Sequence, residues 1–154
     1  ARNGTMRRNF QGYTTDVSDA LLAFGASAIG EFPQGFVQSA RDTLEWSQKI
    51  DRNESPVTRG LATTAEDRMR SEVIERLMCD LSVDAAEIAK RHGFDPAIFD
   101  DVPEKLEPAI FAGIAEVKGS RISVRPRHRL FLRTVAAAFD AHFVAAPNRH
   151  AKAV

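Results

Sequence analysis

The sequence predicts a mainly α-helical chain with one small β-hairpin, and two observations indicate this fold class. Over residues 64–144, apolar side chains recur three or four positions apart, which is the spacing of one helix face. Gly119-Ser120 separates two short stretches with strand character, and such a pair favours a two-residue hairpin turn. A length of 154 residues with 44% hydrophobic content suits an ordinary domain with its own core.

Residues 1–52 are expected to be irregular. The stretch 7–15 contains aromatic residues and threonines and favours a short strand, and a short apolar helix is predicted over 19–24. A second helical pattern runs over 37–50. Residues 53–63 are polar and contain a proline and a glycine, so we predict a linker there.

Residues 64–154 are predicted to form a separate small domain. A capping box at Thr63–Glu66 starts its first helix, which runs to about Asp80. A second capping box at Asp84–Glu87 starts a helix that Gly93 ends.

Two further helices flank the predicted hairpin, one near 106–114 and the last over 129–144. Three helices, a hairpin and a further helix are the element order of a winged-helix domain. We therefore predict a winged-helix-like fold for this part, although the same order also serves as a packing scaffold without any ligand.

The charge balance excludes some classes of partner. Twenty-one Lys and Arg residues balance twenty-one Asp and Glu residues, so the whole chain does not attract nucleic acid or an anionic membrane. No apolar run approaches the roughly 20 residues of a membrane span, and no signal peptide is visible, so we expect a cytoplasmic protein.

Metal and thiol chemistry is also limited by composition. Cys79 is the only cysteine, so this chain alone cannot build a thiolate-held iron–sulfur cluster or a cysteine-rich zinc site. It is expected to be a buried small hydrophobe. The four histidines show no metal-ligand spacing.

A basic run crosses the predicted hairpin and the start of the last helix, with five arginines between Arg121 and Arg133. In a DNA-binding winged helix the preceding helix would enter the major groove. Residues 100–116 carry five acidic residues and one lysine, which would repel phosphates, so no nucleic-acid partner is expected.

Two segments resemble a known family. The run Arg8–Thr15 (RNFQGYTT), followed by Gly25–Ile29 (GASAI), resembles oxygen-independent coproporphyrinogen III oxidase (dehydrogenase), a radical S-adenosylmethionine enzyme of haem biosynthesis. The stretches 59–79 and 129–140 are also similar to that family. The resemblance covers nearly all of this chain but only the C-terminal portion of the family's length.

The resemblance implies a role for each part. Residues 1–52 would be the tail of the radical-SAM barrel, the catalytic domain, with its connecting helices, and residues 64–154 the small domain that covers the substrate. Phe10 matches a family residue close to the iron–sulfur cluster, and Gln11 and Ile29 match residues that contact a second S-adenosylmethionine.

The family's reaction is the oxidative decarboxylation of coproporphyrinogen III to protoporphyrinogen IX. It needs a [4Fe-4S] cluster held by a CxxxCxxC motif, which this sequence lacks. No catalytic or metal-ligating residue is therefore assigned here, and the isolated chain is predicted to be inactive. The implied partners are the porphyrinogen and a missing N-terminal barrel, and Arg129 and Arg133 are hypothesised to pair with substrate carboxylates.

Two other interpretations stay open. One is a stand-alone winged-helix-like module that binds nucleic acid or a protein. The other is an inactive truncated product, whose exposed apolar surface around Phe10, Phe24 and Ile29 would mark the lost barrel interface.

Overall fold

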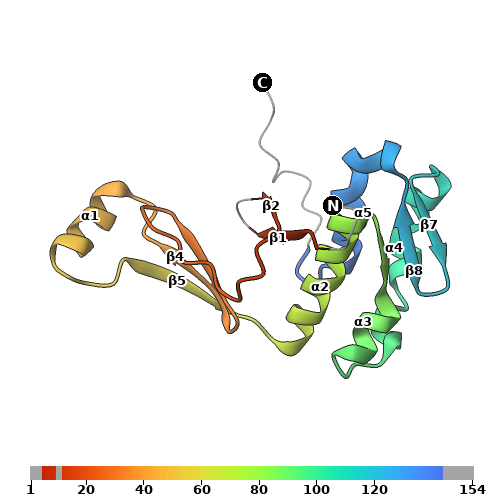
Figure 1. Cartoon of the computed structure of the whole chain (residues 1–154), viewed down its shortest axis with the longest axis horizontal. Coiled ribbons are helices and arrows are strands. Elements are labelled where there is room, and N and C mark those ends of the chain that lie inside the picture. The colour runs from red at the N-terminus through yellow and green to blue at the C-terminus, as the bar shows by residue number, and fades with distance from the viewer. Residues whose placement is uncertain (1–4, 10–11, 144–154) are drawn as a thin grey trace. The chain divides into compact units, whose positions relative to one another are not determined.

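The computed structural model describes residues 5–9 and 12–143, which contain five α-helices and three small antiparallel sheets (Figure 1). The chain divides into two compact units, Ala1–Arg68 and Met69–Val154. Every helix within the described ranges is too short or too polar to cross a bilayer. The prediction of one hairpin in a mainly helical chain is therefore too simple, because strands dominate the first unit.

The first unit contains two of the sheets. Strands β1 (Arg7–Asn9) and β2 (Gly12–Thr14) form an antiparallel pair. The second sheet has three antiparallel strands in the order β3-β4-β5. The members of that sheet are β3 (Ile29–Phe32), β4 (Gly35–Ser39) and β5 (Val57–Ala62). Helix α1 (Thr43–Asp51) connects β4 to β5, as the orange to yellow part of the ribbon shows (Figure 1).

Three predictions for the first unit are wrong. The helix expected over 19–24 is extended chain, because the N–H and C=O of Leu21 both hydrogen bond to Glu31 at 2.8 and 3.0 Å. The helix expected over 37–50 begins only at Thr43, where the Asp42 side chain caps it by accepting from the backbone N–H of Glu45 at 2.9 Å.

The third difference concerns the expected linker. Residues 57–62 of the segment 53–63 form β5, which pairs with β4 through its backbone. All six residues of β5 are exposed, and its sequence VTRGLA shows no regular apolar alternation that would predict a strand. The functional division of the chain into a barrel tail and a small domain remains a prediction.

The second unit has a continuous order of short elements. Helix α2 (Ala65–Asp80) is followed by strand β6 (Ser82–Asp84), helix α3 (Ala85–Arg91), a 3₁₀ turn η1 (Pro96–Phe99) and helix α4 (Val102–Phe111). The predicted hairpin is confirmed as β7 (Ala115–Lys118) and β8 (Arg121–Val124). Strand β6, which the sequence analysis missed, pairs with β8 and gives the sheet order β6-β8-β7.

The last helix is shorter than predicted over 129–144. The segment consists of a 3₁₀ turn η2 (Pro126–Phe131), helix α5 (Leu132–Ala136) and a 3₁₀ turn η3 (Ala137–Phe139). The chain leaves helical geometry at Asp140, where φ is −81° and ψ is 111°. The apolar periodicity that predicted this helix is confirmed at Leu132, Val135, Ala136 and Phe139, which are buried, but not at Phe143, which is 54% exposed beyond the end of the helical geometry.

Both predicted capping sites form helix starts, one of them shifted by a residue. The first box joins Thr64 to Asp67 instead of Thr63 to Glu66: Thr64 Oγ1 accepts from the N–H of Asp67 at 3.0 Å, and Asp67 Oδ2 accepts from the N–H of Thr64 at 2.9 Å. The second is confirmed, with Asp84 Oδ1 accepting from the N–H of Glu87 at 3.1 Å.

The hydrophobic core belongs to the second unit. It joins the inner face of α2 to α3, α4, the sheet and the last turns, and its most completely buried large side chains are Phe139, Met69, Leu77, Leu106 and Leu132. Cys79 is buried beside this core, as predicted. Among the described residues of the first unit, Ala40 is the one buried hydrophobic side chain.

Asp84 links α3 to the hairpin, and we expect its replacement by alanine to cost about 1 kcal/mol of stability, as for other N-caps. Besides capping the helix, its Oδ1 accepts from Ser120 Oγ at 2.8 Å. The Ser120 hydroxyl, then the Glu87 N–H and the charge of Arg121 hold the pKa of Asp84 below its ordinary 3.8. Urea unfolding at pH 7 would measure the loss.

The same contacts predict the sign of a pH effect. Because the folded-state pKa of Asp84 is depressed, its contribution is present above the ordinary pKa and is lost as the pH falls through the folded-state value. The stability difference between Asp84→Ala and the unmodified chain should therefore shrink on acidification. Asp100→Ala, at an exposed position, is the control and should change stability by less than about 0.5 kcal/mol. An equal loss in both variants would contradict the capping role.

Candidate functional site

Ile29 begins strand β3 and is half-buried opposite Gln38 of β4. The loop before it continues the same ladder, since the N–H of Ser27 donates to Ala40 O at 2.7 Å and the N–H of Ser39 donates to Ala28 O at 3.0 Å. Gln38 Nε2 donates to Ser27 O at 3.2 Å. Strand β4 thus holds the Ile29 segment in place.

The small residues of this loop suit its backbone shape. Gly25 has φ of 110° and Ser27 has φ of 60°, both in the left-handed region that bulky side chains avoid. The side chains of this alanine-rich loop are small, so another molecule can approach its backbone closely. Gln38, which fixes the loop, was missed by sequence reasoning because its contact joins residues 11 positions apart without a local pattern.

The other two predicted site residues, Phe10 and Gln11, lie outside the described residues. On either side of them, the N–H of Gly12 donates to Asn9 Oδ1 at 3.2 Å. Of the three candidates, the structure therefore positions Ile29 alone, and their grouping into one site stays a prediction.

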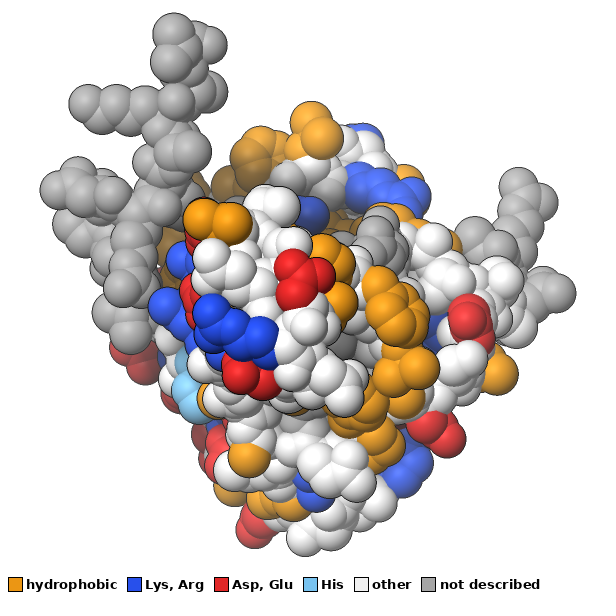
Figure 2. All heavy atoms as spheres, turned by 90° about the vertical axis from the view of Figure 1, so that its left-hand side faces the viewer, with side chains coloured by type: hydrophobic (Ala, Val, Ile, Leu, Met, Phe, Trp, Pro, Cys, Tyr) orange, Lys and Arg blue, Asp and Glu red, His pale blue; other side chains and the backbone are white. Residues whose placement is uncertain are grey.

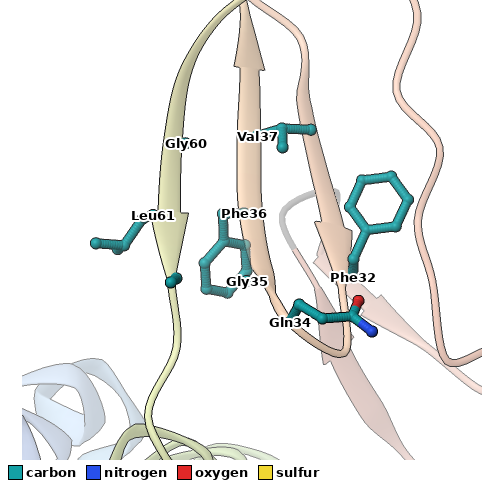
Figure 3. Close-up of a pocket in the computed structure, with 8 residues that line it drawn as sticks. Phe32, Gln34, Gly35, Phe36, Val37, Gly60 and Leu61 are labelled. Carbon is teal, nitrogen blue, oxygen red and sulfur yellow. The ribbon is translucent and has the colours of Figure 1, made fainter.

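An apolar pocket of about 350 Å³ lies on the β3-β4-β5 sheet (Figure 3). Its lining comes from the end of β3, the following turn, β4 and β5: Phe32, Gln34, Gly35, Phe36, Val37, Gly60, Leu61 and Ala62. Gln34 is its one polar side chain. Such a pocket has little to orient a charged ligand and is better suited to another apolar surface.

The first unit exposes further large apolar side chains. Phe24 is 89% exposed, Val17 73% and Leu22 65%. Figure 2 looks at the chain from the end where α1, β4 and β5 lie in Figure 1, and shows hydrophobic side chains gathered in a band. A gathered apolar surface of this kind indicates a contact area for protein.

Comparison with known proteins identifies relatives of the whole chain, although no family model matches it. It is 43% identical over 150 residues to the oxygen-independent coproporphyrinogen III oxidase of Bradyrhizobium diazoefficiens and 40% identical to that of Paracoccus denitrificans. These alignments cover 97% and 96% of this chain but 33% of each relative. The solved coproporphyrinogen III oxidase of Escherichia coli, described as a radical SAM enzyme, superposes with a TM-score of 0.84 at 31% identity, covering 92% of this chain and 33% of that chain.

By sequence and by fold, the chain matches the C-terminal third of the oxygen-independent coproporphyrinogen III oxidases. It spans about a third of the length of these oxidases. The resemblance first noted in the RNFQGYTT and GASAI segments therefore extends along nearly the whole chain.

The oxidase family implies an iron–sulfur cluster, and the donor groups of this chain do not fit one. Cys79 is the only cysteine of the sequence, and it is buried. Among the described residues, no three His, Cys, Asp or Glu side chains come together in a metal-binding group.

Proposed function

We propose that this chain forms the C-terminal part of an oxygen-independent coproporphyrinogen III dehydrogenase. The reaction is the oxidative decarboxylation of two propionate side chains of coproporphyrinogen III, which yields protoporphyrinogen IX in haem biosynthesis. The observation that carries the proposal is the 43% identity over 97% of the chain to an oxidase of which the match covers only 33%.

In this proposal the first unit supplies one wall of an S-adenosylmethionine site. The side-chain amide of Gln11 can donate to and accept from the polar cofactor, and Ile29 offers an apolar wall beside the small-residue loop. Phe10 would lie near the cluster. When bound, the cofactor supplies the radical chemistry, while these residues bind and orient it.

The exposed apolar side chains of the first unit support the proposal that another part of the enzyme packs against this unit. Phe24, Leu22 and Leu61 are exposed, and in the proposed enzyme the N-terminal portion would cover such side chains. The cluster would be held by that portion as well. The chain by itself is therefore predicted to be catalytically inactive.

The second unit is proposed to be the winged-helix-like domain that covers the substrate. Its order α2-β6-α3-α4-β7-β8 and its sheet order β6-β8-β7 support this architecture, with the β7–β8 hairpin as the wing. A nucleic-acid ligand is disfavoured, since exposed Asp100, Asp101, Glu104 and Glu107 lie at and near the start of α4. Arg129 and Arg133 are exposed and remain candidates for substrate carboxylates.

A chimeric enzyme tests the proposal. The C-terminal third of the Bradyrhizobium oxidase is replaced by this chain, and anaerobic conversion of coproporphyrinogen III is measured together with the cluster absorbance. We expect an active chimera. In it, Gln11→Ala should raise the KM for S-adenosylmethionine about 3- to 10-fold, which corresponds to one lost hydrogen bond.

Gln48→Ala is the matched control, because Gln48 is exposed on α1. It should leave both kcat and KM unchanged. A chimera with normal cluster absorbance and no activity would contradict the proposed function, and equal KM values for the two glutamine variants would contradict the assignment of Gln11.

A further inference from the structure

A second pocket lies wholly within the second unit and has a different character. Its volume is about 450 Å³, within the range of small-molecule sites. The pocket is open to solvent and is lined by the C-terminal end of α4, strand β7 and the turn after β8. Its lining residues are Ile110, Ala112, Gly113, Ala115, Glu116, Val117, Lys118, Arg125, Arg127 and His128.

The charged side chains of the pocket are mostly cationic. Lys118, Arg125 and Arg127 face a single acid, Glu116. The end of α4 adds little negative potential, because its last carbonyls are already occupied. Pro108 O accepts from Ala112, Ala109 O from Ile114 and Ile110 O from Gly113, at 2.9 to 3.1 Å.

One of the arginines is fixed in place. Arg125 Nε donates to Glu116 Oε1 at 2.8 Å, and Arg125 Nη2 donates to the same oxygen. The hydrogen bond and charge of Arg125 also lower the pKa of Glu116. Lys118 Nζ lies 3.8 Å from the other carboxylate oxygen, Oε2, so Glu116 pairs with two of the three basic side chains in the lining, and Arg127 is the third.

Arg127 is the available cation. The N–H of His128 donates to Arg125 O at 2.8 Å, which closes a four-residue turn that contains Arg127. Arg127 is exposed, and its side chain makes no hydrogen bond or ion pair with any described residue. In the same turn, His128 Nδ1 is buried and lacks a hydrogen-bond partner among those residues.

The pocket lining also contains apolar side chains. Ile110 is 38% exposed, and Ala112 and Val117 line the pocket with it. The neighbouring Phe111 is 95% exposed. A ligand that matches both kinds of lining residue carries an anionic group on an apolar body.

We propose that this pocket binds a small amphipathic anion, with its carboxylate or phosphate group on Arg127 and its apolar body against Ile110 and Val117. The site is complete within the second unit, so its binding can be measured without the oxidase reaction. A polyanion such as DNA is disfavoured by the acidic residues near the start of α4.

The test is an NMR titration of the ¹⁵N-labelled whole chain at constant ionic strength. Three probes are compared: 3-phenylpropionate, the neutral 3-phenylpropionamide, and inorganic phosphate. We expect 3-phenylpropionate to shift the amide signals of Gly113, Lys118 and Arg127 in a saturable way. The neutral amide should bind at least 5-fold more weakly, since it lacks the charge that pairs with arginine. If inorganic phosphate binds more tightly than 3-phenylpropionate, the apolar half of the proposal is overturned.

Variants separate a site from general surface charge. Arg127→Gln should weaken 3-phenylpropionate binding about 3- to 10-fold, and Arg127→Lys should retain most of it. Arg121→Gln removes the same charge from the β7–β8 hairpin outside the pocket lining and should change affinity less than 2-fold. Equal effects of Arg127→Gln and Arg121→Gln, or equal binding of acid and amide, would overturn the proposal.

Discussion

Replacing Phe139 by alanine is expected to lower the free energy of unfolding by about 3–5 kcal/mol, the usual cost of deleting a fully buried phenyl ring. Phe139 is 0% exposed at the centre of the second unit's core. Its ring packs edge to face on Phe99 with centroids 5.5 Å apart, and Arg70 lies over the Phe99 ring at 5.3 Å. Arg70 Nη1 also donates to Phe139 O at 3.1 Å. The cavity would therefore loosen an aromatic contact and the groups around it.

Urea unfolding followed by far-ultraviolet circular dichroism measures this loss. Phe111→Ala is the matched control, because the same ring is deleted from a position that is 95% exposed. It should change stability by less than about 0.5 kcal/mol. Similar losses of unfolding free energy in the two variants would contradict the burial of Phe139 in this core.

Replacing Gly35 by alanine is expected to destabilise the β3-β4-β5 sheet by at least about 2 kcal/mol. Gly35 has φ of +146°, which side chains avoid, and an added Cβ would lie 2.0 Å from the backbone oxygen of Leu61. Since that oxygen belongs to the paired strand β5, the clash cannot be relieved by turning a side chain. The β4–β5 ladder would have to open.

Amide hydrogen exchange in β4 and β5 reports this opening residue by residue. We expect protection of the Phe36 and Leu61 amides, which lie opposite each other in the β4–β5 ladder, to fall more than 10-fold, which corresponds to about 1.4 kcal/mol. Gly60→Ala tests the same substitution in the same sheet, where the added Cβ would meet its nearest atom at 3.8 Å. It should leave protection within about 3-fold, and an equal loss in both variants would contradict the close β4–β5 approach at Gly35.

The candidate site shows where sequence reasoning succeeds. The RNFQGYTT and GASAI segments were sufficient to indicate the oxidase family, and the comparisons support that resemblance along the chain. The contact that positions Ile29, from Gln38 to Ser27 O, could not be predicted, because it depends on the pairing of β3 with β4. The pocket proposed to bind an anion was missed for a similar reason: the arginine run was recognised, but the pairing of Arg125 with Glu116, nine positions away, was not.

By itself, the sequence determined the features whose causes are local. The Asp84 cap, the buried face of α2 at Met69, Val73 and Leu77, and the Gly119-Ser120 turn all rest on side chains a few positions apart. Only the tertiary structure decided that 35–39 and 57–62 are strands and that the last helix is broken into short turns. Strand pairing joins backbone groups that are far apart in the chain. An exposed strand such as β5 has no apolar alternation from which the pairing could be predicted.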